Sequence, residues 1–219
     1  RLVGSEMCIR DRNTIVIVLA DHGDGMGSHR MVTKQVSFYE EMTNVPFIIA
    51  GPGIHPRQKP VEDLLTQPTI DLLPTLCELA GIPVPSSKPG ISLAPFLKGE
   101  KQKRQHPYAA SEWHSEYEVT VSPGRMIRSP RYKYTHYLEG NGEELYDMLK
   151  DKGERRNLAH DPKYSKILAE HRALLDDYIR RTQDDYRSLK VEADKRWRSH
   201  APGYPNHEGP CARDIINRK

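Results

Sequence analysis

The 219-residue chain has a formal net charge of +3, from 33 Lys and Arg against 30 Asp and Glu, so we expect one globular domain without a nucleic-acid partner. The hydrophobic fraction of 37% lies below the usual range of about 45–50%, which predicts a modest core, and 17 Pro and 15 Gly indicate many loops. No run of about 18 apolar residues is present, which excludes a membrane span, and three widely separated Cys exclude a disulfide scaffold and a zinc finger.

The first twelve residues differ from the sequence that follows. They read RLVGSEMCIRDR, which has neither helical nor strand periodicity, whereas a strongly patterned run begins at Asn13. We expect residues 1–12 to be read-through sequence joined to a truncated reading frame. An irregular native N-terminus is the alternative.

Residues 13–105 predict an α/β domain. Residues 14–20 form a continuous aliphatic and β-branched run, typical of a strand that is buried on both faces of a parallel sheet. A second buried strand is predicted over residues 45–50, after a short helix over residues 38–42. The order of strand, crossover and strand favours a doubly wound sheet.

A longer helix is predicted over residues 66–80. Its apolar residues recur at helical spacing, and Gly81 is placed to end it. Pro74 should kink this helix or restrict it to the residues that follow.

Residues 106–182 predict a C-terminal α+β subdomain, after a surface connection rich in Pro, Ser and Lys. Short β-like runs and a turn signal at residues 139–142 indicate a small antiparallel sheet. A covering helix follows the cap that Asp161 and Pro162 supply. Residues 183–219 read as a charged, irregular tail. Alternation along the strands favours a solvated face for four basic residues: Arg125, Arg128, Arg131 and Lys133.

The densest group of polar residues follows the first strand and reads DHGDGMGSHR over residues 21–30. Open α/β sheets build ligand sites at such strand ends, where the Asp21 carboxylate and the His22 imidazole can bind a metal ion. Spacing and the nitrogen ligand favour zinc or manganese over calcium. A glycine-rich turn, in which Asp21 and His22 only cap local amides, is the alternative.

Two further residues are candidates for contact with an anionic or sugar ligand. Lys34 follows Asp21 by thirteen residues and can reach back to an anion, although a solvated lysine is the simpler interpretation. His114 lies near the subdomain boundary, where the C-terminal region can close over substrate, with an ordinary strand end as the alternative.

Several motifs, in one order, resemble the second half of the catalytic domain of the sulfatase family, in the alkaline phosphatase superfamily. These motifs are DHGDGMGSHRMVTK, SFYEEMTNVPFIIAGPG, TQPTIDLLPTLCELAGI and RMIRSPRYKYTHYLEGNGEELYDMLKDKGERRNLA. The resemblance covers residues 13–178, and the C-terminal part is most similar to N-sulfoglucosamine sulfohydrolase-like members. It implies the C-terminal part of an alkaline-phosphatase-like doubly wound sheet, followed by a small antiparallel sheet packed with a helix.

The resemblance also implies roles for single residues. Asp21 and His22 match residues that contact one active-site Ca²⁺, Lys34 matches the lysine that contacts the sulfate group, and His29 is a candidate substrate contact. The family's nucleophile is a formylglycine made in a Cys/Ser-x-Pro/Ala-x-Arg motif. This chain has no such motif, because its nearest string, VSPGR, has Val in place of the nucleophile. We therefore expect half an active site and a chain that is inactive alone.

We expect the intact protein to be a sulfuric ester hydrolase acting on sulfate esters or sulfamates. Its substrate would be a sulfated carbohydrate or another small sulfate ester, and the resemblance implies a periplasmic or secreted enzyme. One alternative is a phosphate or phosphonate ester hydrolase of the same superfamily. The other is a noncatalytic binding protein on a degenerate sulfatase fold. The sequence does not predict the oligomeric state.

Overall fold

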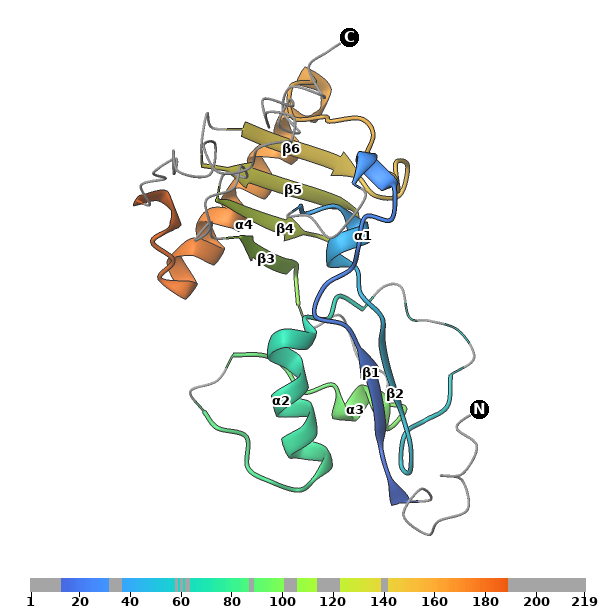
Figure 1. Cartoon of the computed structure of the whole chain (residues 1–219). Helices are drawn as coiled ribbons and strands as arrows, with labels where there is room; N and C mark the ends of the chain where they lie inside the picture. The colour runs from blue at the N-terminus through green and yellow to red at the C-terminus, as the bar shows by residue number, and fades with distance from the viewer. Residues whose placement is uncertain are drawn as a thin grey trace, which may run out of the picture. The chain divides into compact units, whose positions relative to one another are not determined.

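The computed structural model describes residues 13–31, 37–57, 59, 61, 64–86, 89–100, 106–113, 123–138 and 142–188 (Figure 1). The suspect residues 1–12 and most of the predicted tail lie outside the described residues. The described chain forms two compact units. The first contains the described residues up to 31 and those from 41 to 109, and the second contains residues 37–40 and 110–188. A short segment of the second unit is thus inserted, in sequence, between two stretches of the first.

The first unit contains a two-stranded ladder of β1 (Val16–Leu19) and β2 (Phe47–Ala50). The strands are antiparallel, with Val16 opposite Ala50 and Leu19 opposite Phe47, so the expected parallel direction is wrong for this pair. Parallel pairing needs a long crossover, usually a full helix, whereas the α-helix between these strands, α1 (Glu40–Thr43), is a single turn. Val16, Val18 and Ile48 remain 51–56% exposed, so the described residues do not provide the burial that the apolar run predicts.

The predicted helix at residues 66–80 is α2 (Pro68–Leu79), which packs beside the short α3 (Ala94–Leu97). It continues through Pro74 and is not restricted to the residues that follow. Pro74 has no N–H, so Ile70 lacks a helical hydrogen bond to its carbonyl. Gly90 lies against that carbonyl, because a Cβ atom added to Gly90 would be 2.0 Å from Ile70 O. Because glycine has no Cβ atom, the backbone at residue 90 can lie against the carbonyl that Pro74 leaves without its helical hydrogen bond.

Asp71 joins α2 to two later segments of the first unit. Its carboxylate is fully buried, and it accepts hydrogen bonds from the N–H groups of Gln67 and Ile91 at 2.8 and 2.9 Å. The same carboxylate lies 2.9 Å from His106 Nε2. Buried polar groups are stable when they are hydrogen-bonded in this way.

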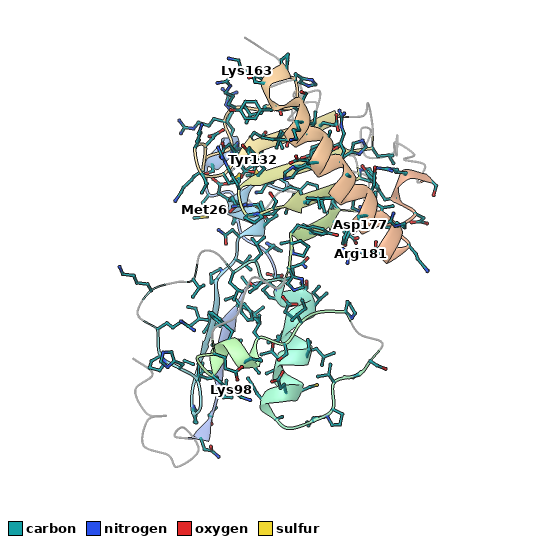
Figure 2. The ribbon with its side chains drawn as sticks, turned by 180° about the vertical axis from the view of Figure 1, so that it is seen from behind. Met26, Lys98, Tyr132, Lys163, Asp177 and Arg181 are labelled. Carbon is teal, nitrogen blue, oxygen red and sulfur yellow. The ribbon has the colours of Figure 1, made fainter. Side chains whose placement is uncertain are left out.

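The second unit contains the predicted antiparallel sheet, in the order β3 (Ala109–Trp113), β4 (Gly124–Arg128), β5 (Tyr132–Tyr137) and β6 (Gly142–Asp147). Helix α4 (Ser165–Thr182) crosses one face of this sheet, as expected (Figure 1). The turn η4 (Pro162–Tyr164) precedes it, and the Asp161 side chain caps that turn. Figure 2 shows α4 in front of the sheet and labels Asp177 and Arg181 on this helix. These two exposed side chains form an ion pair, with Arg181 Nε 2.8 Å from Asp177 Oδ2. None of the helices in the described part of the chain is long and apolar enough to cross a membrane.

The core of the second unit lies between the sheet and α4. Its apolar centre includes Ile127, Leu145 and Leu175, each at most 1% exposed. Tyr186, in the turn η5 (Tyr186–Ser188), is also fully buried although it lies in the segment expected to be irregular. The Arg125 guanidinium stacks 4.5 Å from the centre of the Tyr186 ring, which attaches this segment to the sheet.

Two of the basic residues expected on a solvated face are buried ion-pair partners instead. Arg125 donates to both carboxylate oxygens of Asp184, at 2.6 and 2.9 Å. Lys133 is 1% exposed and lies among carboxylates and a carbonyl. Charged groups can be buried at this depth because opposite charges compensate for lost hydration.

Glu144 is buried on β6. Its raised pKa predicts an unusual pH dependence of the free energy of unfolding. Burial, and then repulsion from Glu154, raises the pKa of Glu144 to about 7. The folded state therefore binds more protons than the unfolded state from the ordinary pKa of about 4.5 up to about pH 7, and stability falls as pH rises through this window. Glu144→Gln removes the cost of ionising a buried carboxyl group, so at pH 8 the free energy of unfolding should increase by up to about 3 kcal/mol.

Chemical denaturation at pH 4 and pH 8 measures this effect. Glu143→Gln is the matched control, because hydrogen bonding to Arg172 lowers the pKa of Glu143 despite its partial burial. The control should lose stability at pH 8, whereas Glu144→Gln should gain it. Equal losses in both variants would contradict the assignment of Glu144.

Candidate functional site

The predicted site lies in the loop that leaves β1, and this loop packs closely against α1. Gly23 N donates to Met42 O at 2.9 Å. A Cβ atom added to Gly23 would be 1.8 Å from Glu41 O, which is far inside van der Waals contact. Only glycine permits this approach of the two backbones. The loop after β1 is therefore held by main-chain contact with α1.

Asp21 and His22 form a pair that can accept a cation. His22 Nδ1 lies 2.7 Å from Gly23 O, which assigns the ring hydrogen to Nδ1 and leaves the Nε2 lone pair available. His22 Nε2 lies 3.6 Å from Asp21 Oδ2. Ligand distances of about 2.0–2.6 Å allow one cation to contact two atoms at this separation. The Asp21 side chain is 88% exposed, so its carboxylate is accessible to an incoming cation.

The same loop contains an unusual concentration of left-handed backbone. Three non-glycine residues have positive φ angles, namely Met26 at 43°, His29 at 50° and Arg30 at 62°. Such conformations cost on the order of 1–3 kcal/mol each and concentrate at functional sites. Met26, labelled in Figure 2, is exposed, so packing of its side chain does not compensate for the strain. The backbone thus supports a functional role for this loop independently of its polar side chains.

His29 lies near a carboxylate that no sequence motif indicated. Its Nε2 atom is 3.9 Å from Glu41 Oε2, and that buried oxygen has no hydrogen-bond partner among the described residues. This distance is too long for a hydrogen bond, although it places opposite charges side by side when the imidazole is protonated. Glu41 therefore belongs to the surroundings of the candidate substrate contact His29.

The structure brings together only part of the predicted site. Asp21, His22 and His29 share one loop, whereas Lys34 and His114 lie outside the described residues and stay predictions. Within the described ranges, no group of three or more His, Cys, Asp or Glu side chains is arranged to hold a metal. Asp21 and His22 can therefore supply two ligands of a metal site but not a complete set.

Sequence comparison identifies a family over most of the chain. Residues 27–181 match the family described as N-sulphoglucosamine sulphohydrolase, C-terminal. Over 208 residues the chain is 76% identical to a Delta 4,5-hexuronate-2-O-sulfatase of Bacteroides thetaiotaomicron. The match covers 95% of this chain and 43% of that relative, so the chain spans less than half of the relative's length.

Three solved structures share the fold. A 2-O GAG sulfatase, 76% identical, has a TM-score of 0.83 over 95% of this chain and 45% of its own. A protein in complex with its substrate D-glucosamine-2-N,6-O-disulfate is 26% identical, with a TM-score of 0.71 over 82% of this chain and 37% of its own. A phosphonate monoester hydrolase from Silicibacter pomeroyi is 28% identical, with a TM-score of 0.68 over 80% and 36%.

Proposed function

The chain belongs to the N-sulphoglucosamine sulphohydrolase C-terminal family of the sulfatases, and on this premise we propose that the intact protein hydrolyses sulfate esters of a sulfated carbohydrate. The observation that carries this proposal is the 76% identity with a hexuronate 2-O-sulfatase over 95% of the chain. The same identity supports a finer proposal. The substrate is a Δ4,5-unsaturated hexuronate that carries a 2-O-sulfate.

Asp21 and His22 would hold one Ca²⁺ in this enzyme. The 3.6 Å separation of His22 Nε2 and Asp21 Oδ2 supports the pairing, as does the orientation of the imidazole by Gly23 O. When bound, the cation supplies positive charge to the sulfate oxygens. Calcium takes about six to eight ligands, mostly oxygen, so we propose that other residues complete the site. Lys34 would add a second positive charge toward the sulfate group.

The nucleophile is proposed to be a formylglycine supplied from outside the printed sequence. None of the three Cys begins a Cys-x-Pro/Ala-x-Arg motif in this chain. When present, formylglycine supplies the oxygen nucleophile for attack on sulfur. The residues of this chain would then bind and orient the sulfate group and neutralise charge on its oxygens.

Sulfate release from defined disaccharides tests the proposal. The intact protein should release sulfate from an unsaturated disaccharide with a 2-O-sulfated hexuronate, and at least about a hundredfold more slowly from one sulfated only at O6 of the hexosamine. Ion chromatography measures the free sulfate, and mass spectrometry verifies the formylglycine in the same sample. No sulfate release by protein that contains formylglycine would favour a noncatalytic binding protein.

A phosphonate or phosphate ester hydrolase is the second candidate. This candidate is supported by the structural similarity to a phosphonate monoester hydrolase, which has a TM-score of 0.68 at 28% identity. Aryl phosphonate and phosphate monoesters should be assayed beside the disaccharides under the same conditions. A kcat/KM that is higher for the phosphonate than for every sulfate ester would replace the sulfatase proposal.

A further inference from the structure

A polar pocket lies on the face of the second unit's sheet that α4 covers. It has a volume of about 510 Å³, within the range of about 300–1,000 Å³ that is typical of small-molecule sites. Tyr134 and His136 of β5 and Glu143 of β6 line it from the sheet. Arg172 of α4 and Arg187 of η5 line it from the covering elements. Side chains from four elements of one unit therefore surround the same hollow.

The periods of strand and helix bring these side chains together. Tyr134 and His136 are two positions apart on β5, so they share a face of the sheet. Glu143 lies directly opposite His136 in the ladder of β5 and β6. On α4, Arg172 and Asp176 are four positions apart and share one side of the helix. The pocket thus follows from regular secondary structure.

Ion pairs and hydrogen bonds hold the lining side chains in place. The Glu143 side chain is 11% exposed and accepts from Arg172 Nε at 2.7 Å and from the Tyr134 hydroxyl. Arg187 Nη2 lies 2.5 Å from Asp176 Oδ1. Polar groups that are already ordered lose little conformational entropy when a ligand binds. The pocket is therefore preorganised for a polar ligand.

The formal charges of the pocket cancel. Arg172 and Arg187 contribute two positive charges, and Glu143 and Asp176 contribute two negative charges. A sulfate ion therefore gains no net electrostatic attraction here. The same two pairs place N–H donors beside carboxylate acceptors. Arg187 uses Nη2 for Asp176, so its Nε and Nη1 can donate to a ligand.

We propose that this pocket binds an uncharged sugar unit through its hydroxyl groups. Each hydroxyl can both donate and accept, so it can bridge a guanidinium and the carboxylate beside it. Leu138 adds an apolar contact for the C–H groups of the sugar ring. The proposal rests on the function proposed above for the source of the ligand, which is an unsulfated unit of the carbohydrate chain.

A saturation-transfer NMR titration of the intact protein with N-acetylglucosamine tests the pocket. This probe is uncharged and has no sulfate to release. We expect a Kd on the order of 1 mM for a ligand of this size. Inorganic sulfate at the same concentration should not displace the sugar, because the charges of the pocket cancel.

Arg187→Ala should weaken the binding of N-acetylglucosamine about tenfold, because a hydrogen bond from a charged donor is lost. The unfolding midpoint should stay at its wild-type value, since the Arg187 and Asp176 side chains are 52% and 58% exposed and surface pairs contribute little. Arg181→Ala is the matched control. Arg181 pairs with Asp177 at 2.8 Å on the same helix and lies outside the pocket lining described above (Figure 2). The control should bind the sugar with wild-type affinity.

Absence of sugar binding, wild-type affinity in Arg187→Ala, or displacement of the sugar by sulfate would overturn the proposal. Displacement by sulfate would make the pocket an anion site. Failure of the proposed function gives a different result, because protein that releases no sulfate would still bind N-acetylglucosamine in a manner that depends on Arg187. Protein that releases 2-O-sulfate but shows no such binding would reject the pocket alone.

Discussion

Replacing Asp21 with Ala in the intact protein will weaken calcium binding and sulfate release together, each by on the order of a hundredfold or more. The carboxylate is one of the two proposed ligands in the described loop, and His22 Nε2 at 3.6 Å cannot replace its charge. Calcium affinity depends on the number of charged oxygen ligands, so the loss of one carboxylate is not compensated by the imidazole. In the proposed enzyme, turnover should fall with the affinity because a bound cation would supply positive charge to the sulfate group.

Titration calorimetry with calcium, zinc and manganese measures the affinity, and sulfate release measures the turnover. Asp24→Ala is the matched control in the same loop, because the Asp24 carboxylate accepts the N–H of Met26 at 3.1 Å and caps a local turn. We expect this control to retain calcium affinity within a few-fold of wild type. Calcium binding that Asp21→Ala leaves unchanged would reject the ligand assignment. If zinc or manganese bound more tightly than calcium, that ion would be assigned to the proposed site in place of calcium.

The second unit was predictable because its signals are local. The Asp161–Pro162 cap, the helical periodicity that follows it and the turn signal between β5 and β6 each involve neighbouring residues. The direction of β1 and β2 was not predictable in the same way. An apolar run predicts a strand and its burial, whereas the direction of pairing depends on how far the intervening chain travels.

The buried charges of β4 and β5 are a second feature that local sequence patterns do not predict. Alternation along a strand separates two faces but does not show which face is covered. Arg125 is paired with Asp184, 59 positions away, and Lys133 donates to a carbonyl 95 positions away. No local pattern connects such partners.

The candidate site also combines residues with local sequence signals and residues without them. Asp21 and His22 were candidates from the sequence because their side-chain chemistry follows a strand directly, and their role as metal ligands stays a prediction. Met42 was not, because it contributes a backbone carbonyl, and a sequence gives no sign of which carbonyl will meet the loop. Gly23 offered a partial signal, since a glycine beside a polar motif indicates a close backbone approach.

Gly23→Ala is therefore expected to have the largest effect of any single-methyl change in the loop. The new Cβ atom would lie 1.8 Å from Glu41 O and 2.8 Å from Glu41 C, both backbone atoms that cannot rotate away. The loop or α1 must move by about 1 Å or more, and the hydrogen bond from Gly23 N to Met42 O is disturbed. Overpacking of this kind costs about 1–3 kcal/mol of stability. A displacement of about 1 Å at a catalytic group can reduce turnover by about a hundredfold.

Gly153→Ala isolates this effect from the general consequences of removing a glycine. A Cβ atom at Gly153 would meet its nearest neighbour, the Arg155 side chain, at an ordinary 3.6 Å. This control should be neutral or stabilising by about 0.4–1 kcal/mol, since alanine restricts the unfolded chain. Chemical denaturation, calcium calorimetry and sulfate release should be measured on both variants. Wild-type stability and turnover in Gly23→Ala would mean that the loop and α1 do not touch in solution.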